Sequence, residues 1–137
     1  MVKTALSIGA NTFAFFTRNP RGSKAKKEDA ADAEKAVSML QSENFGKLVA
    51  HGAYTMNLCT ADTEARAFAA EVLEDDLRRM AALPGNFYNF HPGSHVGQGT
   101  QSGIDYIAAA LKNALRHDYP VTVLLETMAG KGCEIGG

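Results

Sequence analysis

The feature that most constrains the fold is a regular alternation between short apolar runs and longer segments with apolar residues every three or four positions. Runs rich in β-branched and aromatic residues predict buried strands, and the three-to-four spacing predicts amphipathic helices. The predicted strands cover 12–17, 47–51, 86–90 and 121–126, and the predicted helices cover 28–43, about 63–82 and about 103–116. The first nine residues resemble the end of one more helix. Strands that alternate with helices predict right-handed βαβ units and a parallel sheet.

The length limits how much of such a fold the chain can build. It has 137 residues, of which 45% are hydrophobic and 21% charged, which is typical of one globular domain. A whole (β/α)₈ barrel takes about 250 residues. The alternation therefore predicts an α/β fold that is either a small doubly wound sheet or a partial (β/α)₈ TIM barrel with about four parallel strands.

Charge and composition exclude several functional classes. The formal net charge is -1, so a polyanionic partner would have to be met by a local patch. No apolar run is long enough for a membrane helix, and the start MVKTALSIGANTF lacks the long apolar core of a signal peptide. Cys59 and Cys133 form no CxxC motif, which favours reduced thiols in a cytoplasmic protein.

Three of the predicted strands end on residues that bind metals, namely His51, His91 and Glu126. Because ligands bind at the carboxyl ends of parallel strands, these side chains are expected at one edge of the sheet. Imidazoles and carboxylates are ordinary ligands of zinc and other first-row metals. A single histidine at a strand end is more often a polar group satisfied by a loop. Three such residues on successive strand ends favour a metal site.

The stretch NFHPGSH (89–95) holds two histidines four positions apart. A helix would place both on one face, but Pro92 between them excludes a helix. His91 is then the strand-end residue, and Pro92-Gly93 makes a rigid corner. His95 could be a ligand, a residue that supports a ligand or a loop donor, and the last two are favoured.

The first long loop, RNPRGSKAKK (18–27), is basic. It is either a solvated charged loop or a phosphate-binding loop, because it follows a strand end and opens onto the same edge. Its cations are Arg18, Arg21, Lys24, Lys26 and Lys27. Tyr54 follows the next strand by three residues and could pack under its loop or stack on a base.

Four segments together resemble a known family. NTFAFFTRNPRG, VAHGAYTMNL, NFHPGSHVGQG and LLETMAGKGCEIG occur in this order and are similar to endonuclease IV, the zinc-dependent apurinic/apyrimidinic endonuclease of DNA base-excision repair. The resemblance covers essentially the whole chain. It implies a (β/α)₈ barrel with three zinc ions at its C-terminal edge. It also implies hydrolysis of the phosphodiester bond 5′ to an abasic site in duplex DNA.

The resemblance further implies roles for individual residues. His51 and His91 would bind one zinc, and Glu126 would bridge this zinc to a second. Asn19 and Arg21 would contact DNA. Arg21 and Tyr54 would help displace the abasic nucleotide from the base stack.

The chain also departs from the family pattern. The first family strand would lie before residue 1, and the second half of the barrel is absent, so residues 1–137 are expected to form a single incomplete barrel domain. At most one zinc would be well liganded, and activity of the chain alone would be low or absent. Open sheet edges would allow self-association. The alternatives are a non-catalytic zinc- or DNA-binding module and a xylose isomerase-like sugar isomerase, although RNPRG and FHPGSH favour DNA repair.

Overall fold

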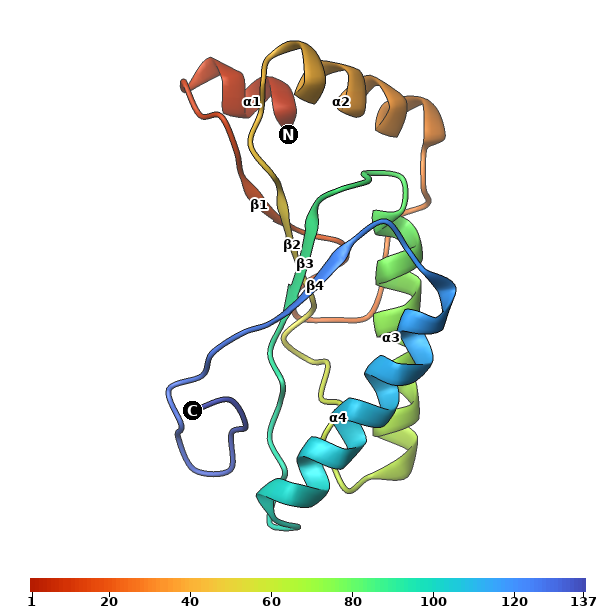
Figure 1. The fold of residues 1–137 in the computed structure, drawn as a ribbon, viewed down its shortest axis with the longest axis vertical. Helices are drawn as coiled ribbons and strands as arrows, with labels where there is room; N and C mark the ends of the chain where they lie inside the picture. Colours follow the sequence, from red (N-terminus) through yellow and green to blue (C-terminus); the bar gives the residue numbers. More distant parts are fainter.

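The computed structural model describes residues 1–137 and contains one four-stranded sheet whose strands are all parallel. The strands follow chain order, β1-β2-β3-β4, and helices connect them (Figure 1). The strands are β1 (Ala14–Phe16), β2 (Val49–His51), β3 (Phe87–Phe90) and β4 (Thr122–Leu125). The helices are α1 (Val2–Ser7), α2 (Ala30–Ser42), α3 (Thr63–Met80) and α4 (Thr100–Ala114), followed by the 3₁₀ turn η1 (Leu115–His117). The predicted partial barrel with four parallel strands is confirmed.

Helix ends follow the capping residues in the sequence. The Asp29 side chain accepts a hydrogen bond from the Asp32 amide at the start of α2, and Asp62 accepts from the Glu64 and Ala65 amides at the start of α3. The start of α4 was predicted three residues too late. The first turn of α4 is polar and shows no apolar period, since it consists of Thr100, Gln101 and Ser102. The helix begins directly after Gly99, whose φ of 97° is one that glycine adopts readily.

The core lies between the sheet and α3, with α4 beside α3 on the same face (Figure 1). Tyr88 and Phe90 from β3 and Ala50 from β2 are almost completely buried there. The buried positions of α3 are Ala69, Val72, Leu73, Asp76, Leu77 and Met80. The three-to-four spacing of apolar residues in 63–82 also predicts that Phe68 lies on this face. Phe68 is instead 50% exposed, because the buried stripe is centred one position further along the helix.

The helices α1 and α2 contact each other at the other end of the molecule (Figure 1). No residue of α2 is fully buried, so the predicted apolar face of this helix is only partly covered. A cavity of about 810 Å³ separates α1 and α2 from β1, with Phe13, Phe15 and Met39 among its lining. No helix in the structure is both long enough and apolar enough to cross a bilayer.

Candidate metal centre

The sheet register places the three predicted ligands on one face at one edge. His51 ends β2 and lies opposite Asn89 of β3, which in turn lies opposite Leu124 of β4. His91 is two residues beyond Asn89, and Glu126 is two residues beyond Leu124. Because strand side chains alternate between faces, residues two apart point the same way. His91 and Glu126 follow the last residues of β3 and β4 by one position. The predicted strand 86–90 ends where β3 ends, whereas the predicted strand 121–126 extends one residue beyond the end of β4.

The three side chains converge. One ligand atom from each of His51, His91 and Glu126 lies within 4.8 Å of the others. The Glu126 Oε2 atom is 2.8 Å from His51 Nε2 and 3.5 Å from His91 Nε2. The carboxylate thus sits between the two imidazoles.

A backbone contact orients the His51 ring. Its Nδ1 is 2.7 Å from the carbonyl oxygen of Gly52, so Nδ1–H donates to that carbonyl. This bond turns Nε2 toward Glu126 and His91. A hydrogen bond of this kind is the usual way in which a protein fixes the tautomer and direction of a metal-binding histidine.

Asn89 supports the carboxylate and was not identified from the sequence. Its Nδ2 donates to Glu126 Oε2 at 2.5 Å. Asn89 stands two residues before His91 and therefore projects from the same face of β3. The period of two along NFH was the signal that could have identified it.

Charged and polar neighbours keep Glu126 ionised. Partial burial would raise the pKa of Glu126, but hydrogen bonds from His51 and Asn89 and the nearby His91 outweigh it and hold the pKa below its ordinary value. An ionised carboxylate between two imidazoles is the state that binds a cation. The side chains are 18% exposed for His51, 30% for His91 and 37% for Glu126, so an ion can reach them from solvent.

The donor set fits a first-row divalent metal ion. Two imidazole nitrogens and one carboxylate oxygen form the three-ligand set found in zinc sites that keep a fourth position open. In residues 1–137 this is the only cluster of three or more such groups close enough to share an ion.

Two aromatic side chains surround the cluster. The ring of Tyr54 lies 5.6 Å from that of His51 and 5.5 Å from that of His91, and its residue is 56% exposed. Phe16 of β1 lies 5.3 Å from both His51 and Tyr54. Tyr54 therefore lies beside the cluster rather than under its loop. Phe16 is a neighbour that sequence reasoning missed.

The basic loop 18–27 adjoins this aromatic group. The Tyr54 amide donates to the carbonyl of Pro20 at 2.9 Å, which ties the two loops together. Asn19 and Arg21 are exposed, and the Asn19 side-chain oxygen accepts a hydrogen bond from the Arg21 amide at 3.1 Å. Arg18, the first cation of the loop, is instead buried. The loop is therefore neither wholly solvated nor wholly available to phosphates.

The HPGSH corner is built around Asn57. Gly93 has φ of 105°, and a Cβ there would lie 2.2 Å from Asn57 Oδ1, so only glycine fits. Asn57 also bonds both backbone groups of Ser94. His95 lies outside the ligand cluster, and its Nδ1 accepts a hydrogen bond from the Gly99 amide at 3.2 Å. In the structure His95 acts as a loop acceptor.

Comparison with known proteins identifies a family for this chain. Residues 2–137 match the family described as xylose isomerase-like TIM barrel. The chain is 57% identical over 136 residues to a probable endonuclease 4 of Alkaliphilus oremlandii, covering 99% of this chain and 48% of that protein. It is 55% identical to a probable endonuclease 4 of Clostridium botulinum, covering 99% of this chain and 49% of that protein.

A solved structure agrees with the sequence relatives. The crystal structure of endonuclease IV from Thermus thermophilus superimposes with a TM-score of 0.81 at 28% identity, covering 98% of this chain and 48% of that chain. The chain thus spans about half the length of the relatives it matches. The protein belongs to the xylose isomerase-like TIM barrel family, and within it the chain is related to the proteins named endonuclease 4.

Proposed function

We propose that this chain serves zinc-dependent hydrolysis of DNA at the phosphodiester bond 5′ to an abasic site, in base-excision repair. The observation that carries the proposal is the convergence of His51, His91 and Glu126 at one edge of a parallel sheet, beside an exposed basic loop. The names of the sequence relatives, probable endonuclease 4, support a nuclease. We also propose that residues 1–137 belong to a single barrel domain and act in the cytoplasm, in keeping with two free cysteines.

Each residue has a separate role in this proposal. His51, His91 and Glu126 would hold one zinc ion, and Glu126 would also bridge it to a second. Bound ions of this kind activate water and stabilise both the attacking and leaving oxygens of a phosphodiester. Asn89 keeps the Glu126 carboxylate in place. Residues Asn19, Arg21 and Tyr54 are the proposed DNA contacts.

The number of ligands limits the activity expected of these residues alone. Two-metal hydrolysis needs more protein ligands than the one three-residue cluster in residues 1–137. We therefore expect binding of one zinc and little abasic-site cleavage. We also propose that two copies of the chain can associate through their sheet edges. The edge strands β1 and β4 carry exposed apolar residues such as Phe16 and Leu125.

A second candidate function is a non-catalytic zinc- or DNA-binding module. The single three-ligand cluster favours it, since one site suffices for binding. Turnover separates the two functions, because only the enzyme cleaves DNA.

The test combines a zinc titration with a nicking assay on a duplex that carries one abasic site. We expect one zinc per chain, and loss of that zinc in His51→Ala and in His91→Ala. The control variant His117→Ala should keep the zinc, because the exposed ring of His117 pairs with Glu74 outside the ligand cluster. Nicking by the chain alone should be weak and abolished by EDTA. Zinc binding that survives both ligand substitutions would contradict the proposal, and rapid EDTA-sensitive turnover would contradict the expected incompleteness of the site.

A further inference from the structure

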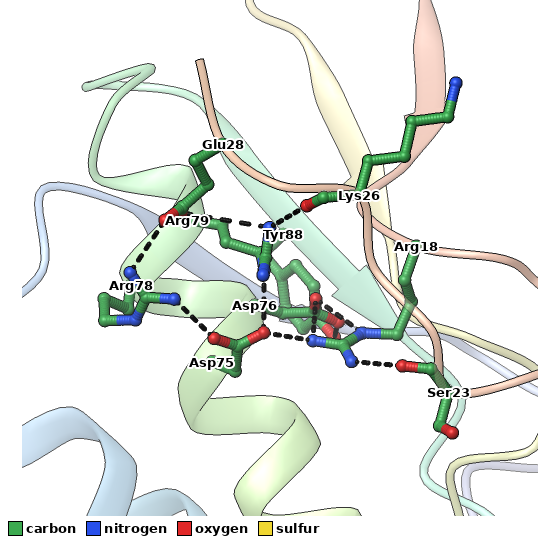
Figure 2. A network of polar contacts seen from close by, with 9 residues as sticks. All are labelled: Arg18, Ser23, Lys26, Glu28, Asp75, Asp76, Arg78, Arg79 and Tyr88. Carbon is green, nitrogen blue, oxygen red and sulfur yellow. Dashed lines mark hydrogen bonds and ion pairs between the residues drawn. The ribbon is translucent and has the colours of Figure 1, made fainter. Parts of the chain in front are cut away.

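The loop that follows β1 is held by an arginine that turns away from solvent. The side chain of Arg18 is only 5% exposed. Its Nε donates to Asp76 Oδ1 at 2.9 Å and its Nη2 to Asp75 Oδ2 at 2.7 Å (Figure 2). Its Nη1 donates to the carbonyl of Ser23 at 2.8 Å. One guanidinium thus joins helix α3 to the backbone of the loop.

The partner of Arg18 on α3 is held from the sheet as well. Asp76 is fully buried, and its Oδ2 accepts a hydrogen bond from the Tyr88 hydroxyl at 2.8 Å. Burial first, and then the charge and hydrogen bond of Asp76, raise the pKa of Tyr88 far above its ordinary value, so the hydroxyl stays a donor. Arg18, Asp76 and Tyr88 therefore link loop, helix and strand through satisfied groups.

Two further contacts tie the far end of the loop to α3. Arg79 Nη1 donates to the carbonyl of Lys26 at 2.9 Å, and Arg78 Nη1 donates to Glu28 Oε2 at 2.9 Å (Figure 2). Both arginines also bind Asp75, at 2.6 Å from Arg78 and 2.7 Å from Arg79. The last turns of α3 hold the loop near both of its ends.

Stability alone does not account for this arrangement. Desolvation offsets much of the attraction within a buried ion pair, and well-packed apolar side chains often stabilise a fold as well. An arginine instead fixes the orientation of the groups it binds, because its planar guanidinium holds five donors in fixed positions.

The residues just after Arg18 form a turn. The Asn19 carbonyl accepts a hydrogen bond from the Gly22 amide at 3.1 Å, and the Asn19 amide donates to the Lys24 carbonyl at 3.1 Å.

We propose that Arg18 is a positioning residue for nucleic-acid binding: its anchorage to Asp75 and Asp76 fixes the turn from which Asn19 and Arg21 meet DNA. The inference rests on the proposed function. Arg18 itself contacts protein, and its effect on DNA passes through Arg21. Of the five cations in loop 18–27, one is thereby assigned to the protein rather than to phosphate.

Hydrogen exchange tests the anchorage. The variant Arg18→Gln is compared with Lys24→Gln, which removes the same charge from an exposed residue of the same loop. We expect the Asn19 and Gly22 amides to exchange at least about tenfold faster in Arg18→Gln only, with the amides of β3 unchanged. Unchanged loop exchange in Arg18→Gln would overturn the inference.

A double-mutant cycle tests positioning for DNA. Affinity for a fluorescent duplex with one abasic site is measured for Arg21→Ala in the wild-type, Arg18→Gln and Lys24→Gln backgrounds. Loss of Arg21 should weaken DNA binding about tenfold in the wild-type and Lys24→Gln backgrounds. In the Arg18→Gln background the loss should be less than about threefold, because the turn that carries Arg21 is no longer held in place there. Equal losses in all three backgrounds would overturn the inference. Zinc stoichiometry should stay the same throughout, which a general loss of structure would not allow.

A second variant keeps the test decisive if Arg18→Gln does not fold. Arg79→Gln removes the bond to the Lys26 carbonyl from a side chain that is already 20% exposed. It should show the same faster loop exchange and the same reduced effect of Arg21→Ala, and a wild-type response in both would count against the anchor. A wild-type chain that binds no duplex contradicts the proposed function, whereas unchanged loop exchange contradicts the anchorage alone.

Discussion

The Nε2 atom of His51 lies 2.8 Å from the carboxylate of Glu126, although 75 positions separate the two residues in the chain. The parallel register of β2, β3 and β4 brings them together, and His91 completes the group. Both nitrogens of His51 face oxygen atoms, Nδ1 the Gly52 carbonyl and Nε2 the Glu126 carboxylate. A bound cation would lie beside Nε2 and the Glu126 carboxylate.

Removal of one ligand should weaken metal binding strongly. His51→Ala or Glu126→Gln is expected to lower zinc affinity by more than about 100-fold, beyond the range typical of residues that only support a ligand. Competition with a chromophoric chelator measures the affinity. His117→Ala, which changes an exposed histidine bonded to Glu74, should leave it unchanged. Wild-type zinc affinity in the Glu126→Gln variant would show that the Glu126 carboxylate is not a metal ligand.

Loss of Asn89 should have a smaller effect than loss of a ligand. Asn89→Ala frees the Glu126 carboxylate to rotate, so zinc affinity is expected to fall about 10- to 100-fold while the stoichiometry stays at one. Asn113→Ala, an exposed amide near the end of α4, serves as the matched control. If both asparagine variants bind zinc alike, Asn89 does not orient the carboxylate.

The corner after His91 should tolerate no side chain at Gly93. Gly93→Ala combines a φ of 105° with a Cβ 2.2 Å from Asn57 Oδ1, and it is expected to destabilise the fold by about 2–4 kcal/mol. Urea unfolding gives this value. Gly97→Ala has a similar positive φ of 84° but open space around it, so its loss should be smaller. Equal losses at the two glycines would show that backbone strain, and not contact with Asn57, decides the effect.

Acid should weaken the contribution of Asp75 to stability. Partial burial would raise the pKa of Asp75, but hydrogen bonds from Arg79, Arg78 and Arg18 outweigh it and hold the pKa well below its ordinary value. A carboxyl whose folded pKa is depressed stabilises the fold above its unfolded pKa, about 3.9, and loses this contribution as pH falls toward the folded value.

The variant Asp75→Asn measures this contribution. It should be less stable than wild type by about 1 kcal/mol at pH 7, given the partial exposure of these ion pairs. Urea unfolding should show the gap narrowing below about pH 4. Glu71→Gln, on an exposed position of the same helix, should show no such trend. A gap that grows on acidification would have the wrong sign for this explanation.

The sequence predicts the sheet edge better than it predicts the contacts that support it. His51, His91 and Glu126 follow from strand ends and a parallel sheet, because those rules depend only on order and period. The structural roles of Asn89 and Asp76 could in principle be predicted from the sequence. Asn89 shares a face with His91, and Asp76 is a charge on the apolar stripe of α3, which requires a buried partner.

Other features depend on packing that no local pattern reveals. Five cations of loop 18–27 look alike in sequence, and only the position of Asp75 and Asp76 decides that Arg18 turns inward. The exposure of Phe68 and the partial burial of α2 likewise depend on how each helix is placed against the sheet. An amphipathic period shows which side of a helix is apolar, but it does not fix how far that helix lies from the sheet.

Anomalous diffraction at the zinc edge, from crystals of the chain grown with zinc, is the most direct test of the proposed metal site. One strong anomalous peak is expected about 2.0–2.2 Å from His51 Nε2, His91 Nε2 and a Glu126 carboxylate oxygen. A zinc-saturated crystal with its peak elsewhere, or with no peak among these three side chains, would contradict it.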